Sequence, residues 1–372
     1  MKISFLCFDL SDNSLGRAAL LAEALAKHHT VELLGPARQG RLWPPMENIS
    51  IPVKLFPWQR YPQFIITTRK ILKAIDGDVI FACKLRPTSF GLGLLKQKEI
   101  PLLVDIDDWE LGFFYGKGFW SSLGKFLNLS NPNGLPYSWL MERMVNRADG
   151  ITVSNRFLQQ KFCGELIYHC RDTGRLDPQK FDPAQAKKKL GLEHKKILMF
   201  LGTPRAHKGI DDVARAMEQI KTPDAHLVLI GSAGEVSEAV KQIATVLPTI
   251  PISEVGDYLA AADVVLVPQR HTHETVGQMP AKIFDAMAMA KPIISTRVSD
   301  IPEVLGDCGY LIEPGNAEQL AEAIDHALSH EDEARSRGQK ARKRCQKLYD
   351  TRLLEEKLVA MVRQVTESRK SQ

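Results

Sequence analysis

The sequence lacks the features that mark membrane-spanning, secreted and zinc-binding proteins. No apolar run approaches the roughly 20 residues that a membrane-spanning helix needs, and the first residues, MKISFLCFDLSDN, carry no signal-peptide cleavage site. The 6 cysteines are scattered without a C-x-x-C pair, so the ligand spacing of a zinc site is absent. A zinc site is therefore not expected, and a reducing, cytoplasmic compartment fits the cysteines best. We also expect no other metal and no cofactor.

Neither sign of charge dominates the composition. The chain has 49 Lys and Arg residues against 44 Asp and Glu residues, which gives a formal net charge of +5. Nucleic-acid binding requires a concentrated basic face, so nucleic acid is not an expected partner. The weak positive charge is compatible with anionic small molecules or with an anionic membrane surface.

Strand-like and helix-like segments alternate along both halves of the chain. Short apolar runs at 2–8, 101–107 and 197–201 are typical of buried strands, and 15–28 and 235–247 are predicted to be helices. The alternation pauses in a polar, proline-containing stretch at 170–196, which is typical of a linker. The pattern predicts an α/β protein with two Rossmann-like, doubly wound domains facing a cleft. In such sheets, ligands bind beyond the carboxyl ends of the strands.

The segment 109–129 interrupts the first half and is dense in aromatic residues. One interpretation is a packed loop that caps the sheet. The other is a lid that contacts an acceptor or dips into a membrane interface. Together with the basic stretch at 335–347, this segment predicts peripheral attachment to the inner face of an anionic membrane.

A strand ending at Gly202 is followed by the loop GTPRAHKGIDD and then by a helix. The loop places Arg205 and Lys208 near a helix N-terminus, where free amides already favour negative charge. These residues predict an anion site, and for a diphosphate Arg and Lys supply complementary contacts. A solvated basic loop, with Asp211 and Asp212 as ordinary first-turn acids, explains the same residues.

The stretch GQMPAKIFDAMAMAKPIIST at 277–296 reads as an apolar helix followed by a strand. Pro280 suits the first turn of that helix, and Lys282 and Asp285 lie on neighbouring helical positions. An unpaired carboxylate among apolar neighbours is costly, so Asp285 needs a partner. That partner is either the two hydroxyls of a ribose or Lys282 itself in a weak ion pair.

Several motifs in a fixed order give the second half a family resemblance. They are FLGTPRAHKGIDDVARAM, HLVLIG, YLAAADVVLVPQ, MPAKIFDAMAMAKPIIST and IPEVLGDCGYLIEPGNAEQLAEAI. The chain resembles retaining GT-B glycosyltransferases of the family-four (group 1) type, closely over 195–330 and loosely before. The resemblance implies an acceptor-binding domain at 1–172, onto which a C-terminal helix at about 350–372 packs back. It also implies a domain at 173–349 that binds a nucleotide-sugar donor.

The resemblance gives the cations of the second half a role. Arg205 and Lys208 match the Arg and Lys that neutralise the donor diphosphate in the family, in the loop that begins at Gly202. Lys282 matches a subgroup with Pro-x-Lys-x-x-Glu, in which it would add positive charge near the phosphates.

The resemblance also places the groups that hold the donor's ribose and sugar. Asp285 stands where the family has the Glu that holds the ribose hydroxyls. Gly277 stands where many relatives have a Glu that touches the donor sugar, and this departure leaves the sugar unnamed. Glu274, three residues earlier, is the nearest carboxylate that could replace it.

In the first half the resemblance covers two shorter motifs. LSDNSLGRAALLAEAL is similar to the glycine-containing loop and helix after the first strand, where Gly16 would let the backbone approach the donor phosphate or the acceptor. Asn13 or Ser14 is expected to cap that helix. Asp107 and Asp108 replace the His or His-Asp pair of many relatives, and they are expected to orient sugar or acceptor hydroxyls during catalysis.

The resemblance implies transfer of a sugar from a nucleoside diphosphate to a glycan or lipid-linked acceptor, with retention of configuration, in cell-envelope polysaccharide or glycolipid synthesis. A UDP-sugar 2-epimerase of the same architecture is an alternative, which His207, His271 and His273 keep open. A non-catalytic nucleotide-binding subunit is the other alternative, because Gly277 and Asp107 depart from the family pattern. A nicotinamide dehydrogenase is disfavoured, since FDLSDNSLG lacks the G-x-G-x-x-G pattern.

Overall fold

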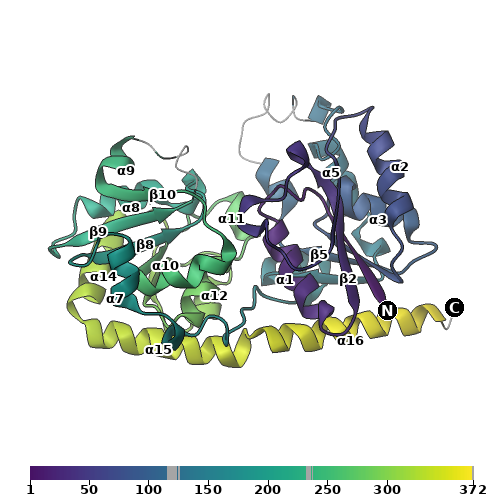
Figure 1. Ribbon diagram of the computed structural model, residues 1–372. Helices are drawn as coiled ribbons and strands as arrows, with labels where there is room; N and C mark the ends of the chain where they lie inside the picture. Colours follow the sequence, from purple (N-terminus) through teal and green to yellow (C-terminus); the bar gives the residue numbers. More distant parts are fainter. Residues whose placement is uncertain (115–123, 125, 232–235, 237, 371–372) are drawn as a thin grey trace. The chain divides into compact units, whose positions relative to one another are not determined.

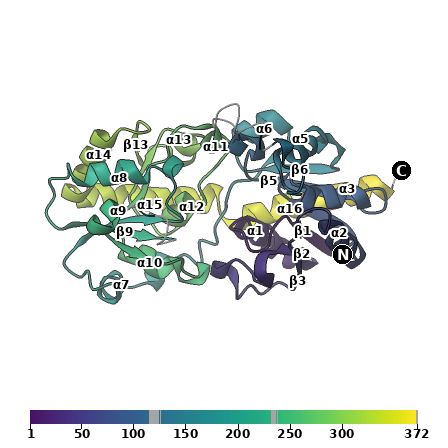
Figure 2. The same ribbon diagram turned by 90° about the horizontal axis from the view of Figure 1, so that it is seen from above.

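The computed structural model describes residues 1–114, 124, 126–231, 236 and 238–370, and it divides the chain into two compact units (Figures 1 and 2). Unit 1 comprises Met1–Tyr168 and Arg352–Gln372, and unit 2 comprises His169–Thr351. The chain therefore passes from one unit to the other twice. The first passage follows Tyr168, a few residues before the boundary at 172 that the resemblance implies.

Unit 1 is built on a seven-stranded parallel sheet in the order β3-β2-β1-β4-β5-β6-β7. Its strands are β1 (Lys2–Cys7), β2 (Thr30–Ala37), β3 (Val53–Pro57), β4 (Val79–Cys83), β5 (Leu102–Ile106), β6 (Gly150–Val153) and β7 (Glu165–Leu166). Its helices are α1 (Leu15–Ala26), α2 (Phe64–Ala74), α3 (Leu92–Lys96), α5 (Leu135–Arg143), α6 (Arg156–Phe162) and α16 (Thr351–Lys370), with short turns η1 (Arg38–Gly40), η2 (Pro44–Met46), η3 (Pro87–Gly91), η4 (Glu110–Phe114) and η5 (Val145–Arg147). The strand order reverses between β1 and β4, and the crevice beyond such a reversal is where ligands bind in this kind of sheet.

Unit 2 is built on a six-stranded parallel sheet in the order β10-β9-β8-β11-β12-β13, which reverses between β8 and β11. Its strands are β8 (Lys196–Leu201), β9 (Ala225–Ile230), β10 (Ala244–Leu247), β11 (Val264–Val267), β12 (Ile293–Thr296) and β13 (Tyr310–Ile312). Its helices are α7 (Pro183–Lys189), α8 (Ile210–Met217), α9 (Glu238–Ile243), α10 (Val255–Ala261), α11 (His273–Val276), α12 (Ala281–Ala288), α13 (Ile301–Leu305), α14 (Ala317–Ser329) and α15 (Glu331–Leu348), with short turns η6 (Pro178–Lys180), η7 (Ala206–Lys208) and η9 (Ile252–Glu254). The prediction of two doubly wound α/β domains is confirmed.

The predicted helix at 235–247 is wrong in its second part. Helix α9 ends at Ile243, and Ala244–Leu247 pair with Leu227–Ile230 as the parallel edge strand β10. Thr245 and Val246 favour a strand, and Pro248 prevents a helix from continuing. A side-chain contact of 2.8 Å between His226 Nε2 and Thr245 Oγ1 joins the same two strands.

The polar stretch at 170–196 is a folded part of unit 2, and its prediction as a linker is wrong. Asp182 caps α7 by accepting hydrogen bonds from the amides of Ala184 and Gln185, and Pro183 occupies the first helical position. The ring of Phe181 lies so close to Gly256 on α10 that a Cβ there would be 2.4 Å from the Phe181 Cζ atom. The stretch has the proline and charge content of a linker because α7 is a short helix on the surface, which begins with a proline and ends in lysines.

The last helix, α16, packs in the core of unit 1, although all of unit 2 separates it in the sequence from the strands of that unit. Leu354, Leu358, Val362 and Val365 recur on one face of α16 and are buried. A Cβ at Gly150 on β6 would be 3.5 Å from a methyl group of Val365.

Among the helices that the structure describes, none combines the length and apolar character needed to cross a membrane.

Candidate active site

The carboxyl end of β8 and the loop that follows it are shaped by two glycines. Gly202 has φ of 100° and Gly209 has φ of 75°, both in the left-handed region that favours glycine. A Cβ at Gly209 would lie only 1.8 Å from the carbonyl oxygen of Pro268, just after β11. The loop from 202 to 209 is therefore held against the end of β11, at the reversal point of the sheet.

Two lysines converge on this loop from different elements. A Cβ at Gly202 would be 3.7 Å from Lys282 Nζ and 4.0 Å from Lys208 Nζ, so η7 and α12 bring both ammonium groups to one place. The Lys282 ammonium also lies 4.2 Å from the centre of the Phe200 ring. Arg205 is exposed on the same loop, one residue before η7.

The electrostatics of this place favour an anion. The pKa of Lys282 lies well below its ordinary value because of burial and the nearby charge of Lys208, while Asp285 opposes the shift. Two cations held close together at a sheet's carboxyl edge are stabilised by a bound diphosphate. The structure thus brings together Gly202, Lys208 and Lys282, which the sequence singled out from two separate motifs.

An ion pair that sequence reasoning missed, between the buried Asp212 and the partly exposed Arg270, holds the loop in place. Arg270, after β11, donates from Nε and Nη2 to Asp212 of α8 at 2.7 and 2.8 Å, and its amide donates to the carbonyl of His207 at 2.9 Å. Burial alone would raise the pKa of Asp212, yet hydrogen bonds from Arg270 and Arg215 lower it. Asp212 is therefore more than a first-turn acid, because it ties α8 to the loop after β11.

Asp285 is paired, and its partner is Arg171. The Arg171 guanidinium donates from Nε to Asp285 Oδ1, and from Nη2 to Oδ2 at 3.1 Å. No ion pair joins Lys282 to Asp285, although the structure describes both side chains, so the weak-pair interpretation is wrong. Each carboxylate oxygen still has a second lone pair, which leaves Asp285 able to accept from ribose hydroxyls. Arg171 lies 114 residues away in the sequence, and no local pattern points to it.

Glu274 and Gly277 belong to the short helix α11. Thr272 and Thr275 form a capping box at its start, and Glu274 lies in its first turn. Gly277 follows the helix with φ of −92°, a conformation open to any residue. Backbone geometry therefore does not explain why a glycine replaces the family's glutamate.

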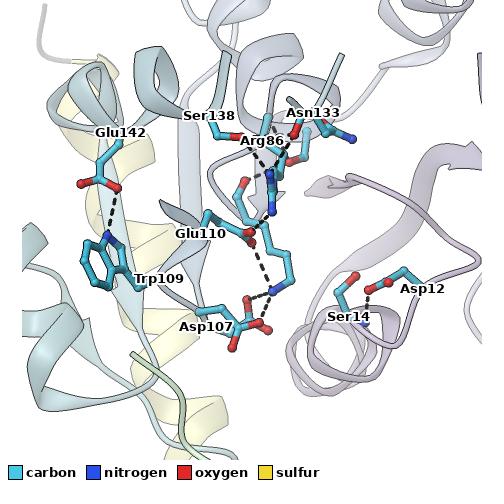
Figure 3. A network of polar contacts seen from close by, with 12 residues as sticks. Asp12, Ser14, Arg86, Asp107, Trp109, Glu110, Asn133, Ser138 and Glu142 are labelled. Atoms are coloured by element: carbon cyan, nitrogen blue, oxygen red, sulfur yellow. Dashed lines mark hydrogen bonds and ion pairs between the residues drawn. The ribbon is translucent and has the colours of Figure 1, made fainter. Parts of the chain in front are cut away.

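In unit 1 a buried lysine that the sequence did not single out lies beside the predicted aspartates. Lys84 follows β4 with φ of 73°, and its amide donates to the Asp105 carbonyl at 2.8 Å. Its Nζ atom lies 2.9 Å from Asp107 Oδ1 and 3.3 Å from Glu110 Oε1, and it also contacts Asp108 Oδ2 (Figure 3). β4 and β5 are neighbouring parallel strands, so their ends deliver these side chains to one point at the sheet's carboxyl edge.

The same network extends to α5 through a second cation. Arg86 pairs with Glu110 and donates from Nη1 to Ser138 Oγ at 2.8 Å and to the Asn133 carbonyl at 2.9 Å (Figure 3). Ser138 is buried on α5. The network therefore links the carboxyl edge of the sheet to the segment that follows the aromatic region.

Burial sets the protonation of the unit 1 network. The pKa of Asp107 is raised to about 7, mainly by burial, with Asp108 and Asp105 adding to the effect and Lys84 opposing it. Burial would lower the pKa of Lys84, but the carboxylates around it raise that pKa well above its ordinary value. Lys84 therefore stays charged, and Asp107 exchanges its proton near neutral pH.

Gly16 lies in the first turn of α1, with an environment different from the one predicted. Ser14 has helical φ and ψ and makes no side-chain cap bond; its amide instead donates to Asp12 Oδ1 at 3.0 Å (Figure 3). The predicted cap by Asn13 or Ser14 is therefore wrong. A Cβ at Gly16 would meet Trp43 at an ordinary contact distance of 3.5 Å.

The start of α1 is fixed by another buried pair. Arg17 donates to both carboxylate oxygens of Asp105, at 3.1 and 2.9 Å, and to the carbonyls of Ile167 and Tyr168.

Across the described ranges, no group of three or more His, Cys, Asp or Glu residues is arranged to hold a metal ion.

Comparison with known proteins decides the family. Residues 195–330 match the family described as Glycosyl transferases group 1. The chain is 30% identical over 369 residues to N-acetyl-alpha-D-glucosaminyl L-malate synthase of Bacillus anthracis, which covers 92% of this chain and 91% of that protein. This chain is a group 1 glycosyltransferase. It is an enzyme, as the resemblance implied.

Two further similarities support the glycosyltransferase assignment and its fold. The enzyme is 30% identical over 143 residues to the putative teichuronic acid biosynthesis glycosyltransferase TuaC of Bacillus subtilis, covering 38% of this chain and 35% of that protein. The structure of Anabaena HepE in complex with UDP-glucose superposes with a TM-score of 0.76 at 17% identity, covering 100% of both chains. The predicted GT-B fold is confirmed.

Proposed function

We propose that this glycosyltransferase takes a sugar from a nucleoside diphosphate bound at the carboxyl edge of the unit 2 sheet. The observation that carries the proposal is the convergence of Lys208 and Lys282 on Gly202. A diphosphate bound beside these two cations supplies complementary negative charge, and Arg205 on the same loop adds a forked donor. Asp285, oriented by Arg171, accepts hydrogen bonds from the ribose hydroxyls.

The mechanism follows from where charge develops. As the bond to the sugar breaks, negative charge grows on the leaving diphosphate, and Lys208, Lys282 and Arg205 stabilise it as preorganised cations. The departing phosphate accepts the proton of the acceptor hydroxyl on the same face, which retains the configuration of the sugar. No covalent nucleophile takes part in this route, and no metal or other cofactor is required.

Unit 1 receives the acceptor in this proposal. Asp107 and Asp108 lie at the carboxyl edge of its sheet, and their carboxylates orient hydroxyl groups of the acceptor or of the transferred sugar. Gly16, in the first turn of α1 and beside Trp43, would let the backbone of that turn approach the donor phosphate or the acceptor. Because TuaC is named for teichuronic acid biosynthesis, we infer a glycan or lipid-linked acceptor in cell-envelope polysaccharide or glycolipid synthesis.

Thermal stabilisation by nucleotides tests the donor site. UDP, GDP or ADP at about 100 times its Kd should stabilise unit 2 by about 2.7 kcal/mol and raise its Tm by several degrees. Arg205→Ala combined with Lys208→Ala should abolish the rise. The control, Lys195→Ala combined with Arg297→Ala on the same unit, should keep it. Absence of stabilisation by all three nucleotides would contradict the proposal.

Product analysis separates transfer from the alternatives. With a nucleotide sugar that stabilises the protein, slow release of free sugar whose anomeric configuration is retained is expected in the absence of acceptor. An epimerised nucleotide sugar would instead point to the 2-epimerase chemistry for which His207, His271 and His273 were considered. Binding without any turnover would indicate a nucleotide-binding subunit.

A further inference from the structure

Exposed apolar side chains gather on neighbouring segments of unit 1. Ile65 and Ile66 on α2 are 46% and 57% exposed, and Trp139 and Leu140 on α5 are each 44% exposed. Between them in the sequence, the segment 126–129 exposes Phe126, Leu127 and Leu129. These groups account for more than half of the strongly exposed large apolar side chains that the structure describes. A concentration of this kind marks an interaction surface.

Specific contacts join these segments near the starts of α2 and α5. The rings of Tyr61, just before α2, and Tyr137 on α5 have centroids 5.5 Å apart. The Tyr61 amide donates to the Ser130 carbonyl at 2.8 Å, and the Tyr137 hydroxyl donates to the Leu129 carbonyl at 2.9 Å. We call the surface formed by α2, residues 126–130 and α5 the apolar face.

The apolar face adjoins the proposed acceptor site. Arg86, which belongs to the Lys84 network, donates to Ser138 on the buried side of α5. Helix α2 follows β3, so it begins on the side of the carboxyl edge of the parallel sheet. A partner bound to this face would therefore lie beside the edge that receives the acceptor.

Positive charges outnumber negative ones on the helices of the apolar face. Helix α2 has the sequence FIITTRKILKA, in which Arg69, Lys70 and Lys73 are exposed and no residue is acidic. The guanidinium of Arg143 lies 4.1 Å from the centre of the Trp139 ring. Apolar side chains that can enter lipid, bordered by cations and an interfacial Trp, are typical of helices that lie on anionic membranes.

The basic stretch at 335–347 is a weaker candidate for the same contact. Within α15, Arg342 donates to the carbonyls of Leu176 and Ala288, and Arg344 donates to those of Val304 and Glu303. These side chains hold elements of unit 2 together. Part of the positive charge that suggested a membrane contact in the sequence therefore serves the fold.

We propose that the apolar face docks unit 1 onto a bilayer containing anionic lipids. Ile65, Ile66, Trp139 and Leu140 enter the headgroup boundary, while Arg69 and Lys70 contact lipid phosphates. Docking brings a lipid-borne hydroxyl acceptor to the Lys84 edge, and this last consequence rests on the proposed function. A protein partner suits the face less well, because the one acidic residue of these three segments, Glu142 on α5, already pairs with Lys161 and accepts a hydrogen bond from Trp109.

Vesicle sedimentation with matched variants tests the docking face. Wild-type protein should sediment with phosphatidylcholine vesicles that contain about one third phosphatidylglycerol, and binding should fall at high salt and with pure phosphatidylcholine. Ile65→Asn with Ile66→Asn, and separately Arg69→Glu with Lys70→Glu, should each weaken binding roughly tenfold or more. The controls are Leu95→Asn on α3, where Leu95 is 64% exposed, and Lys340→Glu with Lys343→Glu on α15. Both controls should bind as the wild type does.

The outcomes decide between surfaces and between proposals. If the wild type does not bind vesicles at low salt, or if the α15 variant loses as much binding as the α2 variants, the proposed docking face is wrong. Self-association that the α2 variants abolish, without vesicle binding, would assign the face to a second copy of the chain. UDP stabilisation should be the same in all variants, because the changed side chains are exposed and outside the donor site. Its absence in the wild type would remove the proposed function while leaving the vesicle result valid.

Discussion

At the scale of single residues, the lysines at the two sheet edges have different charged neighbours in the two units. In unit 1, Lys84 is enclosed by carboxylates and its charge is matched. In unit 2, Lys208 and Lys282 meet at Gly202, and the one carboxylate that favours the charge of Lys282, Asp285, is already paired with Arg171. The first arrangement suits recognition of hydroxyl groups, and the second suits recognition of a diphosphate.

Lys282 should make donor binding depend on pH. Its pKa is lowered in the free protein, and a bound diphosphate raises it, so binding takes up a proton. The affinity for UDP should therefore rise as the pH falls below the ordinary lysine pKa of about 10.4. Lys282→Met should weaken UDP binding about tenfold or more and flatten this dependence, as measured by titration calorimetry. The exposed Lys241→Met is the control, and an equal pH slope in both variants would refute the role of Lys282.

Asp107 should make unit 1 less stable as the pH rises. Its pKa is about 7 in the folded protein against 3.8 ordinarily, so the folded state holds a proton that the unfolded state has released between these values. Stability is lost across that window, at about 1.4 kcal/mol for each unit of pKa difference. Asp107→Asn should reduce the fall in Tm between about pH 5 and pH 8 by several degrees.

The control for Asp107 is another aspartate of unit 1. The pKa of Asp76 is lowered to about 2, chiefly by its hydrogen bond with Lys2, so its contribution is lost only at more acidic pH. Asp76→Asn should leave the difference in Tm between pH 5 and pH 8 unchanged. Equal behaviour of the two variants would show that Asp107 does not titrate near neutral pH.

At the scale of elements, helix α12 joins the proposed donor site to the segments by which the chain enters and leaves unit 2. The Phe284 ring lies 6.3 Å from that of His169 and 5.1 Å from that of Tyr349. Next to it, Asp285 pairs with Arg171, whose own backbone bonds to Tyr349 and Thr351. Asp285 is thus positioned by the two segments, around Arg171 and around Tyr349, through which the chain enters and leaves unit 2.

Arg171 should act on donor binding through Asp285. Arg171→Ala removes the forked donor that orients the carboxylate and should raise the KM for the nucleotide sugar about tenfold, with a smaller change in kcat. Arg171→Lys restores the charge without the fork and should recover only part of the loss. In a double-mutant cycle with Asp285→Asn, a coupling energy of about 1 kcal/mol or more is expected. Additive effects would show that the two residues act separately.

Some elements could be predicted from the sequence and others could not. Strands β1, β4, β5 and β8 are buried on both faces, so they read as continuous apolar runs. The edge strands β3 and β7 lack such a run, and β10 follows α9 without a break, so its residues were assigned to a helix. An edge strand forms where the folded sheet offers an unpaired edge, and the pattern of residues within the strand does not reveal that edge.

At the scale of the whole molecule, unit 1 is completed by residues that follow all of unit 2. Helix α16 buries Leu354, Leu358, Val362 and Val365 in unit 1. The core of unit 1 therefore depends on residues from two separate parts of the chain, whereas unit 2 is a continuous stretch, His169–Thr351.

Leu358→Ala should destabilise unit 1 selectively. Leu358 is fully buried, and removing such a side chain costs about 2–5 kcal/mol. In calorimetry, the transition that UDP does not raise should move to lower temperature by several degrees, while the transition that UDP raises stays in place. The exposed Glu356→Ala on the same helix should change neither. A shift of the UDP-sensitive transition alone would show that α16 stabilises unit 2.

The sequence by itself determined the doubly wound architecture and the positions of Arg205, Lys208, Lys282 and Asp285, because apolar periodicity and loop chemistry are local. Only the tertiary structure decided how these charges are paired. Arg171 reaches Asp285 across 114 residues, and Arg270 reaches Asp212 across 58. The apolar face likewise draws on three separate segments. Parallel sheets bring distant strand ends to one edge, so the partners of a buried charge are set by topology and not by neighbours in the chain.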